Sequence, residues 1–249
     1  MVMAEATNHY FKHLGVSDGL SQVCIPSIYQ DELGAVWLGT TEGLNRYNGK
    51  DVKVFQPSES NHGLTNNEIN ELCGDKNGRM YIRSGNDLIK LDIYTEQFTC
   101  LRQKGVYGLF CKKDTLWVSC ADGIYYYTGQ GTELTFFARV QKGFVGRALY
   151  VDKETVWVVT RKYLVAISRE DPLRQEILLT LDKGNCILGD SSGNIWVGAW
   201  NGLYRISPNR ETTAYVSHSG MGELSDNQVR CVLEDDFKHI WVCTFKGID

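Results

Sequence analysis

Asp31-Glu-Leu-Gly-Ala-Val-Trp-Leu-Gly-Thr-Thr-Glu-Gly-Leu-Asn-Arg-Tyr47 returns in altered form as Asp190-Ser-Ser-Gly-Asn-Ile-Trp-Val-Gly-Ala-Trp-Asn-Gly-Leu-Tyr-Arg-Ile206. Both stretches contain a polar turn, a strand-like segment centred on Trp, and a Gly-Leu step. Four further stretches share this pattern, and the six central aromatic residues are Trp37, Tyr81, Trp117, Trp157, Trp196 and Trp241. Successive aromatics are 44, 36, 40, 39 and 45 residues apart. A period near 40 residues is typical of repeat architectures built from one supersecondary unit.

The first repeat contains four strand-like segments, at residues 23–29, 36–40, 44–47 and 52–55. They are separated by turn residues, among them Asp31, Gly34 and the pair Asn48-Gly49, which is a strong hairpin signal. Four antiparallel strands in about 40 residues make one propeller blade. The 25 glycines and the frequent turns leave no long helical stripe. The predicted fold class is therefore all-β, a β-propeller of four-stranded antiparallel blades with about six blades present.

The repeat spacing also sets the expected organisation of the chain. We expect an N-terminal segment at 1–20, which includes a strand that closes the ring. The blades are expected at 21–62, 63–105, 106–143, 144–184 and 185–223, followed by an incomplete one at 224–249. Two alternatives stay open: a truncated, open ring, or a six-bladed ring closed by strand exchange in which residues 11–14 add the outer strand. An open ring exposes strand edges that favour pairing with another chain, so we expect a homodimer.

Composition excludes several classes of function. The net charge of −4 gives no basic footprint, so we expect no direct contact with nucleic acid or with a membrane. The eight cysteines form no Cys-x-x-Cys, and the five histidines lack metal-ligand spacing. We therefore expect no metal, no cofactor and no catalytic residue. The first residues lack the basic and apolar regions of a signal peptide.

Six stretches of the sequence resemble the two-component-regulator propeller repeat. They are Tyr10-Phe-Lys-His-Leu14, Ser17-Asp-Gly-Leu-Ser21, Ile28-Tyr-Gln-Asp31, the block from Gly34 to Gly49, Gly63-Leu-Thr-Asn-Asn-Glu-Ile69 and Leu224-Ser-Asp-Asn-Gln-Val229. The resemblance covers essentially residues 10–249. It implies the N-terminal sensor region of a hybrid two-component system of the Bacteroides type, which contains seven-bladed propellers.

The resemblance carries further expectations. It implies a periplasmic location, with a parent protein anchored in the inner membrane and carrying a second propeller, a sandwich domain and a histidine kinase. The sensor would recognise a glycan-derived ligand, such as an oligosaccharide, and control genes for polysaccharide use. On this reading the chain itself is not an enzyme. Two other classes stay open: a carbohydrate-active propeller enzyme (a lyase or glycosidase), and a scaffold that binds only proteins.

The repeats differ most where the second and third strands of each blade are joined. These turns emerge on one face of the ring, and the candidate ligand-binding residues on them are Trp200, Asn201, Arg161, Asp122, Asn86 and Glu42. Trp200 is unusual because a large aromatic residue at a turn tip gains little from burial. Flat aromatic rings beside polar side chains suit the apolar faces and hydroxyl rims of sugars. The alternative is that Trp200 packs against a neighbouring blade.

Overall fold

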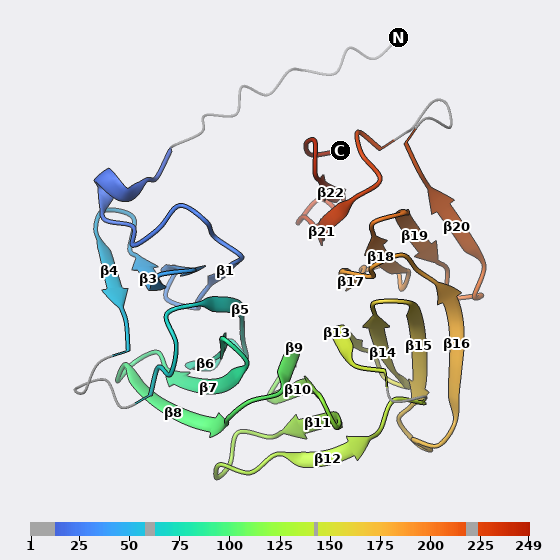
Figure 1. Ribbon diagram of the computed structural model, residues 1–249, viewed down its shortest axis with the longest axis horizontal. Coiled ribbons are helices and arrows are strands. Elements are labelled where there is room, and N and C mark those ends of the chain that lie inside the picture. The colour runs from blue at the N-terminus through green and yellow to red at the C-terminus, as the bar shows by residue number, and fades with distance from the viewer. Residues whose placement is uncertain (1–12, 58–62, 142–143, 218–223) are drawn as a thin grey trace.

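The computed structural model describes residues 13–57, 63–141, 144–217 and 224–249, and almost all its regular structure is β-strand. Six antiparallel sheets follow one another in chain order around a central axis (Figure 1). In each sheet the first strand lies nearest the axis and later strands lie progressively outward. Each sheet is therefore one blade, and the predicted all-β propeller of about six blades is confirmed.

The first three blades have four strands each. Blade 1 comprises β1 (Ser27–Gln30), β2 (Val36–Thr40), β3 (Gly43–Tyr47) and β4 (Val52–Phe55). Blade 2 comprises β5 (Ile69–Gly74), β6 (Arg79–Ser84), β7 (Asp87–Asp92) and β8 (Gln97–Arg102). Blade 3 comprises β9 (Val106–Lys112), β10 (Thr115–Cys120), β11 (Gly123–Tyr127) and β12 (Thr135–Ala138). A short 3-10 helix, η1 (Val16–Asp18), precedes blade 1.

Two more complete blades and a partial one follow. Blade 4 comprises β13 (Gly146–Val151), β14 (Thr155–Thr160), β15 (Tyr163–Ser168) and β16 (Gln175–Thr180). Blade 5 comprises β17 (Cys186–Gly189), β18 (Ile195–Ala199), β19 (Gly202–Ile206) and β20 (Thr212–Tyr215). In the described residues, blade 6 comprises β21 (Val229–Glu234) and β22 (Ile240–Thr244), extended by a single bridge between Cys243 and Ile248.

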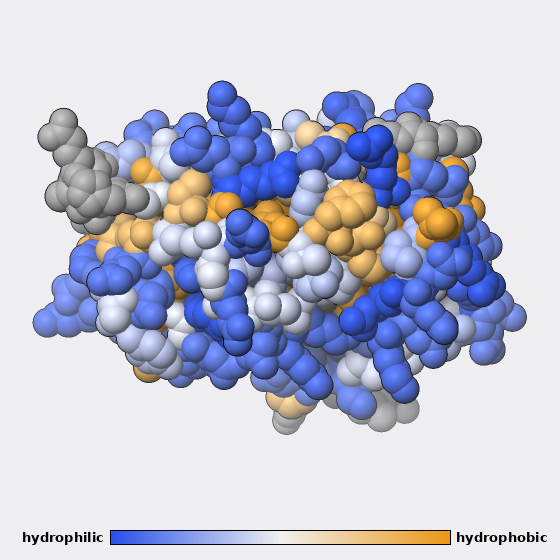
Figure 2. Space-filling model, turned by 90° about the horizontal axis from the view of Figure 1, so that it is seen from below, coloured by the Kyte–Doolittle hydropathy of each residue, from blue (hydrophilic) through white to orange (hydrophobic). Residues whose placement is uncertain are grey.

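Strand direction decides which loops share a face of the ring. Because the strands of a blade alternate in direction, its second-to-third turn lies on the same face as the segments that connect it to the neighbouring blades. We call this the connector face. The turns between first and second strands, and between third and fourth, lie on the opposite face. Seen edge-on, the molecule has hydrophilic rims on both faces and an apolar band between them (Figure 2).

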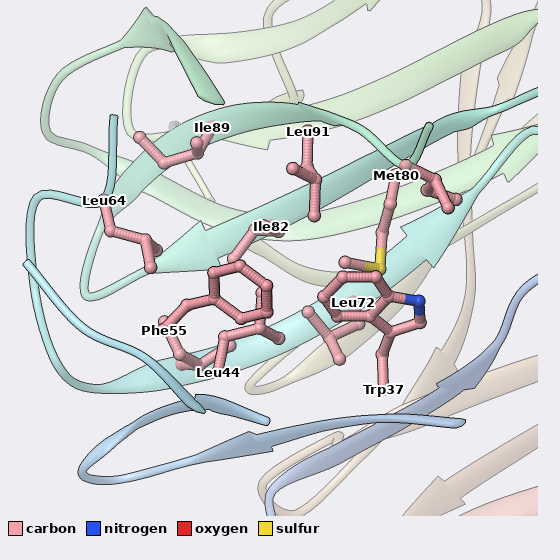
Figure 3. Close-up of a cluster of buried hydrophobic side chains, with 11 residues drawn as sticks. Trp37, Leu44, Phe55, Leu64, Leu72, Met80, Ile82, Ile89 and Leu91 are labelled. Carbon is pink, nitrogen blue, oxygen red and sulfur yellow. The ribbon is translucent and has the colours of Figure 1, made fainter. Parts of the chain in front are cut away.

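Apolar side chains from adjacent blades meet to form the core. Between blades 1 and 2, Trp37, Leu72 and Met80 lie together at one end of a cluster that reaches Phe55 and Leu64 at the other (Figure 3). Further clusters of the same kind join the later blades. Burying one such side chain contributes about 1.5–3 kcal/mol. Stacking of neighbouring blades is therefore what stabilises the ring, as expected of repeat proteins.

A buried leucine fixes the chain where it enters three of the blades, and in two of them a serine hydroxyl does so as well. Leu20, Leu64 and Leu224 are buried in the Gly-Leu-Ser, Gly-Leu-Thr and Glu-Leu-Ser stretches. Ser21 and Thr40 share a hydrogen bond of 2.9 Å between their hydroxyls, and Ser225 and Thr244 share one of 2.8 Å. The recurring Leu-Ser step therefore ties the start of a blade to the end of its second strand.

Each interior blade packs its two flat sides against its two neighbours. The side of blade 1 that faces away from blade 2 and the side of blade 6 that faces away from blade 5 are instead exposed among the described residues. Ile28 of blade 1 is 64% exposed, whereas Leu72 and Leu149 at the equivalent positions of blades 2 and 4 are 7% and 3% exposed. Trp241 of blade 6 is 40% exposed, whereas Trp37 is fully buried. No described strand of blade 6 is hydrogen-bonded to blade 1. These two blade surfaces thus lack the cover that a neighbouring blade gives elsewhere.

The predicted closing strand at 11–14 lies only partly within the described residues. Residues 11 and 12 lie outside the described residues. His13 and Leu14 are described and belong to no strand. Ring closure by exchange of this segment therefore stays a prediction.

Candidate functional site

The predicted site residues lie on the connector face, on the second-to-third turns of blades 1 to 5. Backbone hydrogen bonds hold several of these turns against the segment that leads into the same blade. Gly85 N–H bonds to Glu68 O at 2.7 Å, Ala121 N–H to Gly105 O at 2.8 Å, Trp200 N–H to Asp182 O at 2.8 Å and Phe245 N–H to Gln228 O at 3.0 Å. The turn tips therefore sit on a fixed backbone frame.

Trp200 and Asn201 are adjacent in sequence on one turn, and the structure leaves the other four predicted residues apart from them and from one another. Glu42, Asn86, Asp122 and Arg161 lie on four separate blades, and all four are exposed. No hydrogen bond or ion pair joins any of the six to another among the described residues. A single compact pocket made of all six is therefore not present in this part of the chain.

Asp122 has its own local partners. Its carboxylate accepts hydrogen bonds from Arg102 and from the Tyr125 hydroxyl, both at 2.8 Å. Burial raises the pKa of Asp122, but these two hydrogen bonds outweigh burial, so the pKa lies below its usual value. The carboxylate is ionised and already satisfied at neutral pH. Asp122 therefore stabilises the third blade's turn and is a weak candidate for contacting a ligand.

Trp200 lies among cationic side chains. The Lys183 ammonium is 3.5 Å from the centroid of the Trp200 ring, and the Arg230 guanidinium is 5.8 Å from it. The same guanidinium is 5.6 Å from the centroid of Phe245, which is an exposed aromatic residue on the corresponding turn of blade 6. Cations over aromatic rings are attracted by the ring quadrupole. We call Lys183, Trp200, Arg230 and Phe245 the cation–aromatic cluster.

Asn201 positions the turn beneath this cluster. Its side-chain oxygen Oδ1 accepts a hydrogen bond from the backbone N–H of Asp182 at 3.1 Å, and its side-chain amide Nδ2 donates one to the Tyr204 hydroxyl at 2.7 Å. Asn201 therefore holds the connector that carries Lys183 against the Trp200 turn. Among the four cluster residues, only Trp200 was predicted from the sequence. Lys183 lies on a connector, Arg230 on an innermost strand and Phe245 on a turn of the next blade. Of these three, only Phe245 could have been found from the sequence, since it occupies the Trp200 position of the sixth repeat.

Other sites that could hold a ligand are of a different kind. A cavity of about 520 Å³ opens on the opposite face of blade 4 and is lined mainly by charged residues, among them Glu154, Arg169, Arg174 and Arg210. Across the described residues, no group of three or more His, Cys, Asp or Glu side chains could hold a metal ion. In the same residues no helix has the length and apolar character needed to cross a membrane.

Residues 223–246 match the family described as two component regulator propeller. The sixth repeat is a two component regulator propeller repeat. The predicted resemblance is thereby confirmed, and its match spans β21 and β22 together with Phe245 of the cation–aromatic cluster. The other blades share its antiparallel pairing of first and second strands and have an aromatic residue at the equivalent central position, Trp in four of them and Tyr81 in blade 2.

A curated relative and two solved structures are similar to parts of this chain. The chain is 40% identical over 53 residues to histidine kinase P4 of Formosa agariphila, which is 21% of this chain and 4% of that kinase. Among solved structures, the extracellular domain of a hybrid two component system from B. thetaiotaomicron has a TM-score of 0.74 and 21% identity over 95% of this chain. Virginiamycin B lyase from Staphylococcus aureus has a TM-score of 0.68 and 12% identity, covering 90% of this chain and 78% of the lyase.

These likenesses differ in what they establish. At such low identities the two structural matches show the propeller fold alone. The chain spans 4% of the kinase and 41% of the B. thetaiotaomicron chain, so both are much longer proteins.

Proposed function

We propose that this propeller is an extracytoplasmic sensor module of a hybrid two-component system and that it binds a glycan-derived ligand without transforming it. The observation that carries the proposal is the two component regulator propeller repeat at residues 223–246. The similarity to a histidine kinase and to an extracellular domain of a hybrid two component system supports the same direction. Binding would act by shifting a conformational equilibrium that a distant kinase senses.

The partners follow from this proposal. We propose that the parent protein holds this module in the periplasm and is anchored in the inner membrane. A second propeller, a sandwich domain and a kinase would belong to that parent, and a homodimer would carry the signal. The target genes would be those for using the polysaccharide from which the ligand derives.

The connector face supports ligand binding better than the opposite face does. Trp200 presents an aromatic ring next to Asn201 and to two cations, and aromatic rings with polar neighbours are a common surface for sugars. The large opposite-face cavity is lined mainly by charged side chains, and none of its lining residues is aromatic. Glu42, Asn86, Asp122 and Arg161 would modulate the binding from the surrounding turns.

Isothermal titration calorimetry with a panel of neutral and acidic oligosaccharides tests the proposal. Wild-type protein should bind at least one member, and Trp200→Ala should weaken that binding at least tenfold with an unchanged melting temperature. Unchanged affinity in Trp200→Ala would remove the glycan assignment from this face. Incubating the protein with the parent polysaccharides separates sensor from enzyme, because a lyase or glycosidase would generate unsaturated products or new reducing ends.

A further inference from the structure

Four of the innermost strands contain a bulge at the same place. The pairing of first and second strands skips one residue directly after Ile69, Val106, Gly146 and Val229, which are the first paired residues of β5, β9, β13 and β21. The skipped residues are Asn70, Tyr107, Arg147 and Arg230. A bulge leaves one residue unpaired and re-aims its side chain, and bulges are over-represented beside active sites.

These four residues share a place in the ring. Each stands at the start of an innermost strand, so it lies where the connector face meets the central axis. Tyr107 is 38% exposed, and both arginines are exposed. Arg147 makes no ion pair or side-chain hydrogen bond with any residue the structure describes. An exposed guanidinium on a rigid strand, with no carboxylate beside it, is available to an anion.

Arg230 connects this bulge position to the cation–aromatic cluster. Its guanidinium lies near both Trp200 and Phe245, and Lys183 sits over the Trp200 ring. Aromatic rings attract these two cations but leave their charge in place, whereas a carboxylate would neutralise it. The Lys183 ammonium also covers part of the ring face on which a neutral sugar would stack. The cluster therefore carries net positive charge at the position where the sequence indicated an aromatic sugar platform.

The connector face is charged unevenly. In blades 4 to 6, its turns, connectors and bulge positions carry seven described cations: Arg139, Arg147, Arg161, Lys162, Lys183, Arg230 and Lys246. The same segments carry three described carboxylates: Asp182, Asp226 and Asp249. Two of the carboxylates are engaged, Asp226 with Lys246 at 3.4 Å and Asp249 with Ser225 at 3.0 Å. The corresponding segments of blades 1 to 3 carry fewer cations than carboxylates, namely Arg102 and Lys104 against Asp18, Glu42, Glu68, Asp87 and Asp122, and Arg102 is paired with Asp122. A positive sector thus stands out on a chain of net charge −4.

We propose that this sector, centred on Arg147 and Arg230, binds an acidic oligosaccharide whose carboxylate or sulfate groups pair with the two guanidinium groups. The inference rests on the proposed glycan-sensing function and names the class of sugar. Arg pairs with both oxygens of such a group in a bidentate manner. Phe245 and the part of the Trp200 ring that Lys183 leaves free contact the sugar rings next to the acid groups. Tyr107 offers a hydroxyl on the neighbouring blade.

The test compares sugars that differ only in their acid groups. The probes are short dextran chains of one length in three forms: unmodified, sulfated and carboxymethylated. Calorimetry at low and at moderate salt should show at least tenfold tighter binding of one or both acidic forms than of neutral dextran. Arg147→Gln and Arg230→Gln should each weaken the acidic form at least fivefold without lowering the melting temperature. The sulfated and carboxymethylated forms distinguish the two acid groups.

A matched variant on the opposite face controls for net charge. Arg174→Gln removes the same charge from an exposed arginine on the other side of blade 4, and it should leave binding within twofold of wild type. Equal weakening by Arg174→Gln would overturn the proposal, because the attraction would then be unspecific. The proposal would also be overturned if neither the sulfated nor the carboxymethylated dextran bound. It would likewise be overturned if neutral dextran bound as tightly as both acidic forms.

Two outcomes separate this inference from the proposed function. If a neutral oligosaccharide from the calorimetric panel binds with unchanged affinity in Arg147→Gln and Arg230→Gln, the sensor proposal stands and the acidic-sugar inference fails. Single-stranded DNA or anionic vesicles that bind as tightly as sulfated dextran, with the same dependence on both arginines, would overturn the assignment to a sugar.

Discussion

The indole N–H of Trp196 donates a hydrogen bond to Oδ2 of Asp190, 2.8 Å away. The other oxygen of Asp190 accepts the backbone N–H groups of Ser192 at 3.0 Å and Asn194 at 2.7 Å. One carboxylate therefore holds the turn between the first and second strands and also orients the central aromatic residue of the blade. The same bond joins three more pairs, Asp31 with Trp37, Asp152 with Trp157 and Asp235 with Trp241.

Removing this carboxylate should destabilise the whole ring. Asp190→Ala leaves two backbone N–H groups and the Trp196 indole without their acceptor, and hydrogen bonds to charged groups contribute about 1.5–3 kcal/mol. We expect the free energy of unfolding to fall by about 2–3 kcal/mol in urea titrations followed by tryptophan fluorescence. Asp236→Ala is the control, because this exposed carboxylate makes no hydrogen bond within the described chain. Equal losses in the two variants would contradict this role.

Asp235 makes part of the stability dependent on pH. The hydrogen bond from Trp241, aided by N–H groups and the ring of His239, lowers the pKa of Asp235 from 3.8 to about 2. A carboxyl group whose folded-state pKa is depressed contributes stability above its unfolded pKa and loses it as pH falls toward the folded value. The stability difference between wild type and Asp235→Asn should therefore be constant above about pH 5 and shrink between about pH 3.8 and pH 2.

Urea titrations at several pH values check this expectation. Tryptophan fluorescence reports directly, because Trp241 loses its charged acceptor in Asp235→Asn. A stability difference that stays constant down to about pH 2 would show that the Asp235 carboxylate does not carry the effect.

The fold was predictable because each blade satisfies the same local constraints. The Asp turn, the central aromatic residue and the Gly-Leu step recur in sequence with local variation. In the structure the central aromatics contribute to the buried contacts between blades, and in blades 1, 4, 5 and 6 the Trp also bonds to the turn Asp. The bulges at Asn70, Tyr107, Arg147 and Arg230 were not predictable. They depend on how the innermost strands approach one another around the axis, and no residue type in the sequence marks them.

The candidate site was predictable only in part. Trp200 could be found because a turn tip is an unusual place for Trp, and Asn201 follows it in the same turn. Lys183 and Arg230 are 17 and 30 residues away in sequence. Hydrogen bonds between Asp182 and the Trp200 turn bring Lys183 to the indole, and stacking of blade 6 on blade 5 brings Arg230 there. Arg161 and Glu42 share the turn position but lie on other blades, since repeat equivalence places residues around the ring rather than beside one another.

Equivalent positions in terminal and interior blades should respond differently to a charge. Ile28 is 64% exposed and Leu149 is 3% exposed, although both occupy the same position of their first strands. Ile28→Asp should change the free energy of unfolding by less than about 0.5 kcal/mol, and Leu149→Asp should reduce it by more than about 4 kcal/mol by burying an unpaired charge.

The same pair of variants tests whether the uncovered apolar surface of blade 1 promotes self-association. Exposed apolar surfaces favour association, so Ile28→Asp should lower self-association in sedimentation velocity and reduce binding of the dye ANS. If Ile28→Asp instead unfolds the protein as Leu149→Asp does, the blade 1 surface is covered in solution and the reasoning is wrong.

Gly108 should be required for the close approach of blades 3 and 4. A methyl group at this position would lie 2.8 Å from the backbone oxygen of Arg147, the bulged residue of the next blade. Because the obstacle is backbone, no side-chain rotation relieves it, and overpacking of this kind costs about 1–3 kcal/mol. Gly108→Ala should lower the melting temperature and also weaken binding of acidic dextran by displacing Arg147. Gly15→Ala, whose added methyl group would meet nothing closer than 3.8 Å, should change neither measurement, and a tolerated Gly108→Ala with wild-type binding would show that the bulge does not depend on this contact.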